Sequence, residues 1–365
     1  MVKSLAKTKR TIKKTKLRRK TQNRRVGGKP KTLGEQLATA IFSYHRDNMH
    51  KQLPLIKDLI EQGAYKEDFC RGSTPLGSAI YKKLFPIVEL LLEKGVNVNA
   101  EREGRGGETY LHFAVEGGDL PIVKLLVKHG AVINARDESG STPLHTAAAR
   151  SNLPIVKFLV EHGANINQAN NRGDIPLHYA AAWGNIPTVK FLVEHGVDIN
   201  QANNWGNTSL HNAVIGNYLP VVEFLVEKGA NINQANKAGN TPLHLAAEYE
   251  YVDEDEYVDE DDEDDEDDYE QPENRLPIVN FLLANGADYA KRNNANQMPI
   301  DMSLKGSPIY NALATAREQT QATAIQEMEN APSRPNKTTV HEVPDVLKQH
   351  IASYLGGSNR KYRQV

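Results

Sequence analysis

Five histidines recur at one fixed spacing along this chain, and histidine is a residue type that can bind a metal ion or transfer a proton. They are His112, His145, His178, His211 and His244, each 33 residues after the one before. A zinc site needs its ligands close together, and closely spaced pairs usually supply them. One histidine every 33 residues forms no such cluster. We therefore expect no metal site and interpret these histidines as structural.

Other residues that could carry chemistry are sparse. The single cysteine, Cys70, has no partner for an intrachain disulfide, which suits a reducing compartment, and no local signature of a nucleophile surrounds it. The glycine-rich run 104–107 is too short for a phosphate-binding loop, and no GxxxxGK[ST] pattern occurs. The sequence therefore predicts that the protein is not an enzyme and holds no cofactor.

Each of the five histidines ends a phrase close to Thr-Pro-Leu-His, and the segment around this phrase repeats. The phrase begins at Thr74, Thr109, Thr142, Ile175, Thr208, Thr241 and Met298. The steps between these positions are 35, 33, 33, 33, 33 and 57 residues. A constant period of this size indicates one supersecondary unit that is copied and stacked. Stacked repeats form solenoids, which usually work as extended binding surfaces.

The repeat unit predicts two helices and a turn. Threonine suits a helix N-cap and the following proline suits the first helical position, so the phrase starts a first helix. In the copy at 173–202, a second helix opens at Ile186 and its apolar residues have helical spacing. Gly196 ends that helix, and a polar stretch rich in asparagine and glycine then reverses the chain.

This pattern resembles the ankyrin repeat over residues 36–305. The resemblance implies an all-α fold, an ankyrin-repeat solenoid of helix pairs with β-hairpin-like fingers, in which the repeated histidine links the loop to the helix start. The predicted units are 36–66 as an N-terminal capping unit, 72–103, 107–136, 140–169, 173–202, 206–235, 239–292 with an acidic insertion at 248–275, and a partial unit at 296–305. The near-identical copies are similar to those in ankyrin proteins of intracellular bacteria and large viruses.

A strongly basic block precedes the repeats. Residues 1–32 carry 14 Lys or Arg and no acid, and few of them are apolar. Such a block cannot bury enough surface to fold alone, so we predict a disordered tail at 1–34. Basic runs are typical of nuclear-import signals and of arms that contact nucleic acid. A solvated tail without a specific partner, or a role in secretion, is the alternative.

An acidic block accounts for the long last step, because 57 is 33 plus 24. Residues 250–270 carry 16 Asp or Glu and no base, so like charges keep this insertion extended. It falls in the turn between the two helices of one unit, where an insertion costs the stack little. The insertion could bind a basic partner, contact the basic tail or serve as a solvated spacer. No window fits a calcium-binding loop.

The resemblance implies a concave binding surface built from the finger tips and the exposed face of the first helices. Both tryptophans of the chain, Trp183 and Trp205, fall on it in adjacent repeats, flanked by Arg150 and Arg172. Because Trp, Tyr and Arg are enriched at binding hot spots, we predict that these four residues and Tyr249 bind a protein partner. Further tip positions in the same frame include Ser141, Asp174, Asn207 and Lys237. The alternative is that Trp183 only shields the turn between its two helices.

The repeat pattern stops after residue 305. The predicted segments beyond it are a capping helix at 306–330, a linker at 331–342 and a short amphipathic helix at 343–357. The last segment resembles the first helix of an F-box. The resemblance implies that Pro344, Leu347, Ile351 and Leu355 dock on the adaptor of a cullin-type ubiquitin ligase. The segment is similar to a SOCS-box tail too, and a helix that packs back on the last repeat is a further alternative.

The sequence thus favours a protein–protein interaction scaffold or adaptor, which could also recruit a ubiquitin ligase. Two alternatives are a nuclear or chromatin-associated regulator that uses the basic tail and the acidic insertion, and a plain scaffold. No apolar run is long enough for a membrane span. We expect a monomer with a protein partner inside the cell, in the cytoplasm or nucleus, or in a host cell if it is a secreted effector or viral protein.

Overall fold

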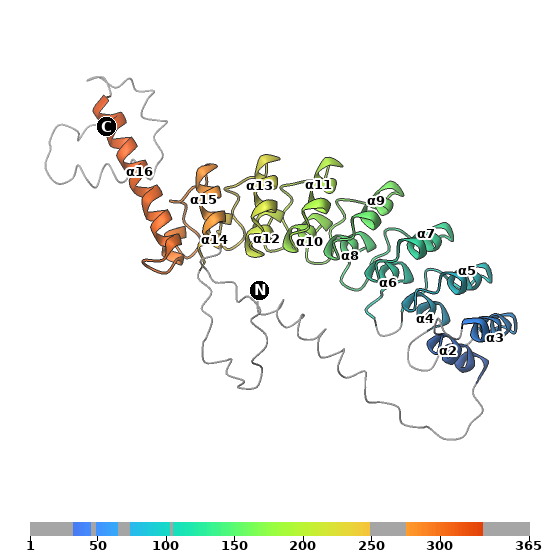
Figure 1. Ribbon diagram of the computed structural model, residues 1–365. Helices are drawn as coiled ribbons and strands as arrows, with labels where there is room; N and C mark the ends of the chain where they lie inside the picture. The colour runs from blue at the N-terminus through green and yellow to red at the C-terminus, as the bar shows by residue number, and fades with distance from the viewer. Residues whose placement is uncertain (1–31, 45–48, 65–73, 103–104, 249–274, 331–365) are drawn as a thin grey trace, which may run out of the picture. The chain divides into compact units, whose positions relative to one another are not determined.

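The computed structural model describes residues 32–44, 49–64, 74–102, 105–248 and 275–330 (Figure 1). These residues belong to two compact units, one within Met1–Cys70 and one within Arg71–Val365. Within the described residues, no helix combines the length and the apolar character needed to cross a bilayer.

The first unit contains two helices that pack on each other, α2 (Leu33–Phe42) and α3 (Met49–Glu61). A capping box starts α2: the Glu35 amide donates to Thr32 Oγ1 at 3.2 Å, and the Thr32 amide donates to Glu35 Oε2 at 3.2 Å. The boundary predicted for the basic tail, residue 34, is therefore wrong by two residues, because this reciprocal cap makes helix of Leu33 and Gly34.

The second unit consists of helix pairs followed by a short 3₁₀ helix and a long helix. The pairs are α4 (Pro75–Tyr81) with α5 (Phe85–Glu93), α6 (Tyr110–Glu116) with α7 (Leu120–Lys128), α8 (Pro143–Ala149) with α9 (Leu153–Glu161), α10 (Pro176–Ala182) with α11 (Ile186–Glu194), α12 (Ser209–Ile215) with α13 (Leu219–Glu227), and α14 (Pro242–Ala247) with α15 (Leu276–Ala284). Figure 1 shows the first helices of the pairs in one row and the second helices in another. Each helix packs on its partner and on the next helix of its own row. The predicted all-α solenoid of helix pairs is confirmed.

The core lies between the two rows. In the first helices, the leucine of the repeated phrase and the alanine three residues later are fully buried, as at Leu144 and Ala147. The small alanine lets neighbouring helices approach closely, and the leucine fills the space between the rows. In the second helices, apolar residues at helical spacing, such as Ile155, Val156 and Leu159, complete this core.

The first turn of α12 departs from those of α8, α10 and α14. Ser209 stands where Pro143, Pro176 and Pro242 stand in other repeats, and its side chain is buried with no hydrogen-bond partner for Oγ among the described residues. The preceding residue, Thr208, has φ −89° and ψ 172°, a conformation that a following proline favours. The backbone at position 209 can therefore accommodate proline.

We expect Ser209→Pro to raise the free energy of unfolding by about 1–2 kcal/mol. It removes a buried unsatisfied hydroxyl and reduces the conformational freedom of the unfolded chain. Urea unfolding followed by circular dichroism measures the change, with Pro176→Ser as the reverse substitution in an adjacent repeat. Ser209→Pro at or below wild-type stability would contradict this account.

The acidic insertion leaves the register of the stack unchanged. Asn200 Nδ2 donates to the Gly229 carbonyl, 29 residues on, at 3.4 Å, and Asn233 Nδ2 makes the equivalent bond to Gly286, 53 residues on, at 3.0 Å. The difference, 53 − 29 = 24, equals the extra length of the last repeat step. The guanidinium of Arg275, directly before α15, donates to carbonyls near the ends of α12 and α14, those of Ile215 (3.4 Å) and Leu245 (3.3 Å). A cation there is favourable, since helix C-termini carry partial negative charge.

The end of the stack is covered by η5 (Pro299–Met302) and α16 (Pro308–Asn330). The first half of α16 packs on α15 and η5 through the buried residues Ile309 and Leu313. These two residues, four apart, lie on one face of the helix, so α16 shields the apolar side of the last pair from water.

Candidate functional site

The repeated histidines join each finger to its own helix and to the next finger. Nδ1 accepts the backbone N–H of the residue three positions earlier, at 3.0 Å in His145 and 3.1 Å in His211. Nε2 lies 3.0 Å from the Asp174 carbonyl in His145 and 3.2 Å from the Asn240 carbonyl in His211. Because a carbonyl only accepts, Nε2 carries the proton. Both ring nitrogens are thus engaged by the protein, and the structural role predicted for this row is confirmed.

This arrangement holds the histidines neutral. Burial lowers the pKa of His145 and of His211 to about 4, against 6.5 for a free side chain. Burial also lowers the pKa of His112, His178 and His244. A second proton on the ring would turn Nδ1 into a donor facing the backbone N–H, so protonation would also break the cap.

The fingers at 170–174 and 203–207 are each built around a buried asparagine, Asn170 and Asn203. Asn203 Oδ1 accepts the amides of Trp205 and Asn207 at 3.0 Å, and Asn203 Nδ2 donates to Asp174 Oδ1 of the preceding finger at 2.7 Å. Three predicted tip positions are wrong for this reason: Ser141, Asp174 and Asn207 are 8%, 8% and 4% exposed. Each is covered by the asparagine of the next finger.

Backbone hydrogen bonds connect the exposed tips of consecutive fingers. The Asn204 amide donates to the Arg172 carbonyl at 2.9 Å, and the Lys237 amide donates to the Trp205 carbonyl at 2.9 Å. Arg172, Trp205 and Lys237 therefore lie on consecutive fingers, with exposed side chains. Trp205 is 41% exposed, an unusual state for a side chain of its size.

The other two predicted residues lie at the opposite end of the first helices. Arg150 and Trp183 are the residues directly after α8 and α10, and these two helices pack on each other. Trp183 is also 41% exposed. The two tryptophans are thus on opposite ends of a layer of seven-residue helices, each about 10 Å long at 1.5 Å per residue. The four predicted residues form two pairs rather than one patch.

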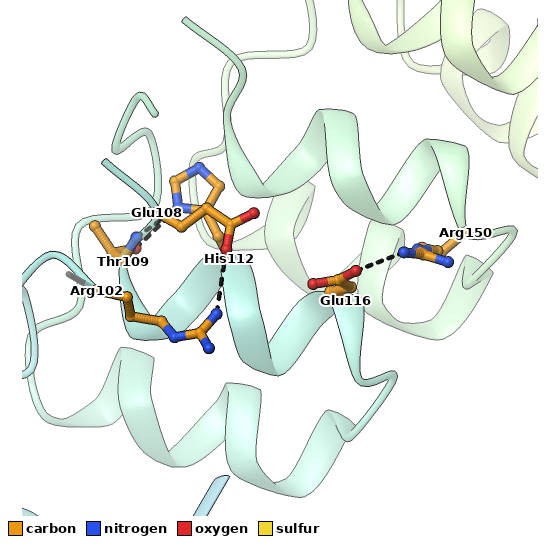
Figure 2. A network of polar contacts seen from close by, with 6 residues as sticks. All are labelled: Arg102, Glu108, Thr109, His112, Glu116 and Arg150. Carbon is orange, nitrogen blue, oxygen red and sulfur yellow. Dashed lines mark hydrogen bonds and ion pairs between the residues drawn. The ribbon is translucent and has the colours of Figure 1, made fainter. Parts of the chain in front are cut away.

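Arg150 is already paired. Its Nη2 lies 2.5 Å from Glu116 Oε1 of the preceding repeat, as Figure 2 shows. Both side chains are about half exposed, so this ion pair adds little stability. It nevertheless neutralises the positive charge of Arg150 with a carboxylate of the same chain. By contrast, the guanidinium of Arg172 makes no hydrogen bond or ion pair with any described residue.

A further cluster at the first fingers was not predicted. The Arg102 guanidinium lies 3.6 Å from the centre of the Phe113 ring. It also pairs with Glu108 at 3.2 Å, as Figure 2 shows. The Tyr81 ring stacks beside Phe113, with 6.3 Å between ring centres and 7° between planes. Burial raises the pKa of Glu108, and the nearby Glu116 raises it further. The sequence feature that could have indicated this cluster is the aromatic residue Phe113, four residues after the N-cap of α6. Tyr179 occupies the equivalent position in α10.

The remaining predicted site residues lie outside the described residues. They are Tyr249 in the acidic insertion and, in the C-terminal segment, Pro344, Leu347, Ile351 and Leu355. Their roles stay predictions.

Family models for ankyrin repeats match the chain from residue 71 to 253. One matches residues 71–102, a model of many copies matches 91–147 and 192–253, and a model of three copies matches 133–203. These matches agree with the helix pairs and with the histidine caps, and all three models describe ankyrin repeats. The chain belongs to the ankyrin-repeat family.

Similar curated proteins share only part of the repeats. XBAT34 of Arabidopsis thaliana, which carries the name of an E3 ubiquitin-protein ligase, is 45% identical over 78 residues, 21% of this chain and 21% of that protein. Delta-latroinsectotoxin-Lt1a of Latrodectus tredecimguttatus is 36% identical over 120 residues, 30% of this chain and 10% of that protein. The chain thus spans about a fifth of the first relative and a tenth of the second.

Solved structures support the same fold. The human ASB11 ankyrin repeat domain has a TM-score of 0.55 and 24% identity, covering 67% of this chain and 97% of that domain. The ankyrin repeat domain of Bcl-3, a member of the IkappaB family, has a TM-score of 0.53 and 27% identity, covering 67% of this chain and 99% of that domain. Ankyrin-repeat chains are typically interaction modules without enzymatic activity, and this fold makes the protein a protein–protein interaction scaffold.

Proposed function

We propose that the protein binds its partner on the face formed by the fingers and the first helices of the repeats at 140–235. The supporting observation is that the chain has two tryptophans, each 41% exposed, at opposite ends of the first helices in adjacent repeats. Exposed tryptophan is costly in water, and tryptophan at the centre of an interface is a frequent hot spot. The half-buried Tyr179 of α10 lies between the two ends.

We expect Trp183→Ala and Trp205→Ala each to weaken partner binding by about 30-fold, the effect of a hot spot worth about 2 kcal/mol. Thermal unfolding should change little, because both side chains are largely outside the core. The measurement is quantitative affinity capture from cell lysate with the full chain, followed by titration of the captured partner. Val132→Ala is the matched control, because Val132 is an exposed apolar residue (53%) in the loop after a second helix.

Binding that survives loss of both tryptophans would contradict this proposal. It would place the contact elsewhere on the stack, for example on the Tyr81, Phe113 and Arg102 cluster.

A finer function, recruitment of a cullin-type ubiquitin ligase, rests on the F-box resemblance of residues 343–357. The described chain reaches Asn330 at the end of α16, so this segment follows the cap of the stack in sequence. Capture experiments with the full chain and with a chain that ends at Thr339 test the idea. We expect ligase subunits with the full chain alone. Equal capture by both chains would assign the segment no ligase role.

A further inference from the structure

The fingers change in charge along the stack. The first two fingers carry acids, Glu108, Asp137 and Glu138, beside Arg102 and Arg105. In the fingers at 170–174, 203–207 and 236–240, the exposed ionic side chains are Arg172 and Lys237. The one acid there, Asp174, is 8% exposed and accepts a hydrogen bond from Asn203 at 2.7 Å. These three fingers thus present positive charge only.

The two cations are free to bind a partner. Neither the Arg172 guanidinium nor the Lys237 ammonium makes a hydrogen bond or ion pair with a described residue, whereas Arg102 is paired with Glu108 and Arg136 donates to the Ala169 carbonyl at 3.0 Å. A partner's carboxylate would therefore not have to displace an internal one. Arginine suits such a carboxylate best, because its planar fork can donate two parallel hydrogen bonds.

The spacing of these groups is set by the backbone. Because the Asn204 amide donates to the Arg172 carbonyl and the Lys237 amide donates to the Trp205 carbonyl, Trp205 lies between the two cations on consecutive fingers. An apolar side chain of a partner can cover the exposed indole while acidic residues on either side reach Arg172 and Lys237.

We propose that the three fingers at 170–240 bind an acidic segment of a partner protein, in which carboxylates flank an apolar residue seated on Trp205. This inference rests on the proposed function, since it names the chemistry of the partner for the same face. A nucleic acid is the less favoured ligand, because its affinity comes from many phosphate contacts and these fingers offer two cations.

The test uses the full chain and a display library of random dodecapeptides. We expect the selected peptides to be enriched in Asp and Glu around an apolar residue. With Trp183→Phe, Trp205 becomes the single tryptophan, and its fluorescence reports the titration of a selected peptide. The dissociation constant should rise at least tenfold in Arg172→Glu/Lys237→Glu, and several-fold between 50 and 300 mM salt. Lys124→Glu/Lys128→Glu, the same charge change on the exposed side of α7, should alter it less than twofold.

The outcomes separate the two proposals. Neutral or basic peptides that still depend on Trp205 would overturn the acidic-partner inference and leave the proposed function standing. Selected peptides whose binding is unaffected by Trp183→Ala and Trp205→Ala would overturn both. Tighter binding of a twelve-residue oligothymidylate than of any selected peptide, lost in Arg172→Glu/Lys237→Glu, would reassign the fingers to phosphate recognition.

Discussion

Lowering the pH from 7.5 to 5 is expected to destabilise the repeat stack strongly through its buried histidines. Burial lowers the pKa of His145 and of His211 to about 4, whereas an unfolded chain has a histidine pKa of about 6.5. Since the unfolded chain takes up protons first, the stabilisation is complete above pH 6.5 and is lost as the pH falls towards 4. Each of these two histidines should cost about 2 kcal/mol by pH 5. The other three repeat histidines act in the same direction.

Urea unfolding of the full chain at pH 7.5, 6.5, 5.5 and 5.0 measures this loss. The acidic insertion is the same in the wild-type chain and in the control variant, so it does not affect the difference between their pH dependences. The control is His145→Gln/His211→Gln, which should be less stable at pH 7.5 but lose about 4 kcal/mol less between pH 7.5 and 5. The same pH slope in both chains would show that these histidines do not control acid stability.

Gly206→Ala is expected to lower the free energy of unfolding by about 3 kcal/mol, through both backbone strain and a steric clash. Gly206 has φ +79°, a region that costs alanine energy, and an added Cβ would lie 2.6 Å from the Lys237 amide nitrogen. That amide donates to the Trp205 carbonyl, so the substitution should break the backbone bond between two fingers. The repeats on either side should then unfold with less cooperativity, because a solenoid depends on its nearest-neighbour interfaces.

Gly229→Ala is the matched control. Gly229 has φ +90° but open space around an added Cβ, so only the strain of about 1–2 kcal/mol remains. Urea unfolding should be followed by circular dichroism and, in a Trp183→Phe background, by the fluorescence of Trp205. In Gly206→Ala the fluorescence transition should precede the loss of helix, while in Gly229→Ala the two should coincide. Equal stability losses in the two variants would rule out the clash.

Much of the fold could be predicted because its signals are local. A threonine or its equivalent before a proline starts α8, α10 and α14 at the expected residues, and a glycine follows each second helix. The start of α2 could also have been predicted from the capping box of Thr32 and Glu35. The basic residues before it led instead to the prediction of a disordered tail. The Arg102 contact with Phe113 was less accessible, because it depends on how the first finger folds over α6.

The sequence by itself determined the helix pairs, their order, the role of the repeated histidine and the two tryptophans that mark the candidate site. The tertiary structure alone decided which polar side chains are available to a partner. Arg150 is matched by Glu116, 34 residues before it, Asp174 is covered by Asn203, 29 residues after it, and Arg172 is left free. In a solenoid, the burial and pairing of a side chain depend on contacts between neighbouring repeats. A local pattern of residue types does not show which residues 29 to 34 positions apart come into contact.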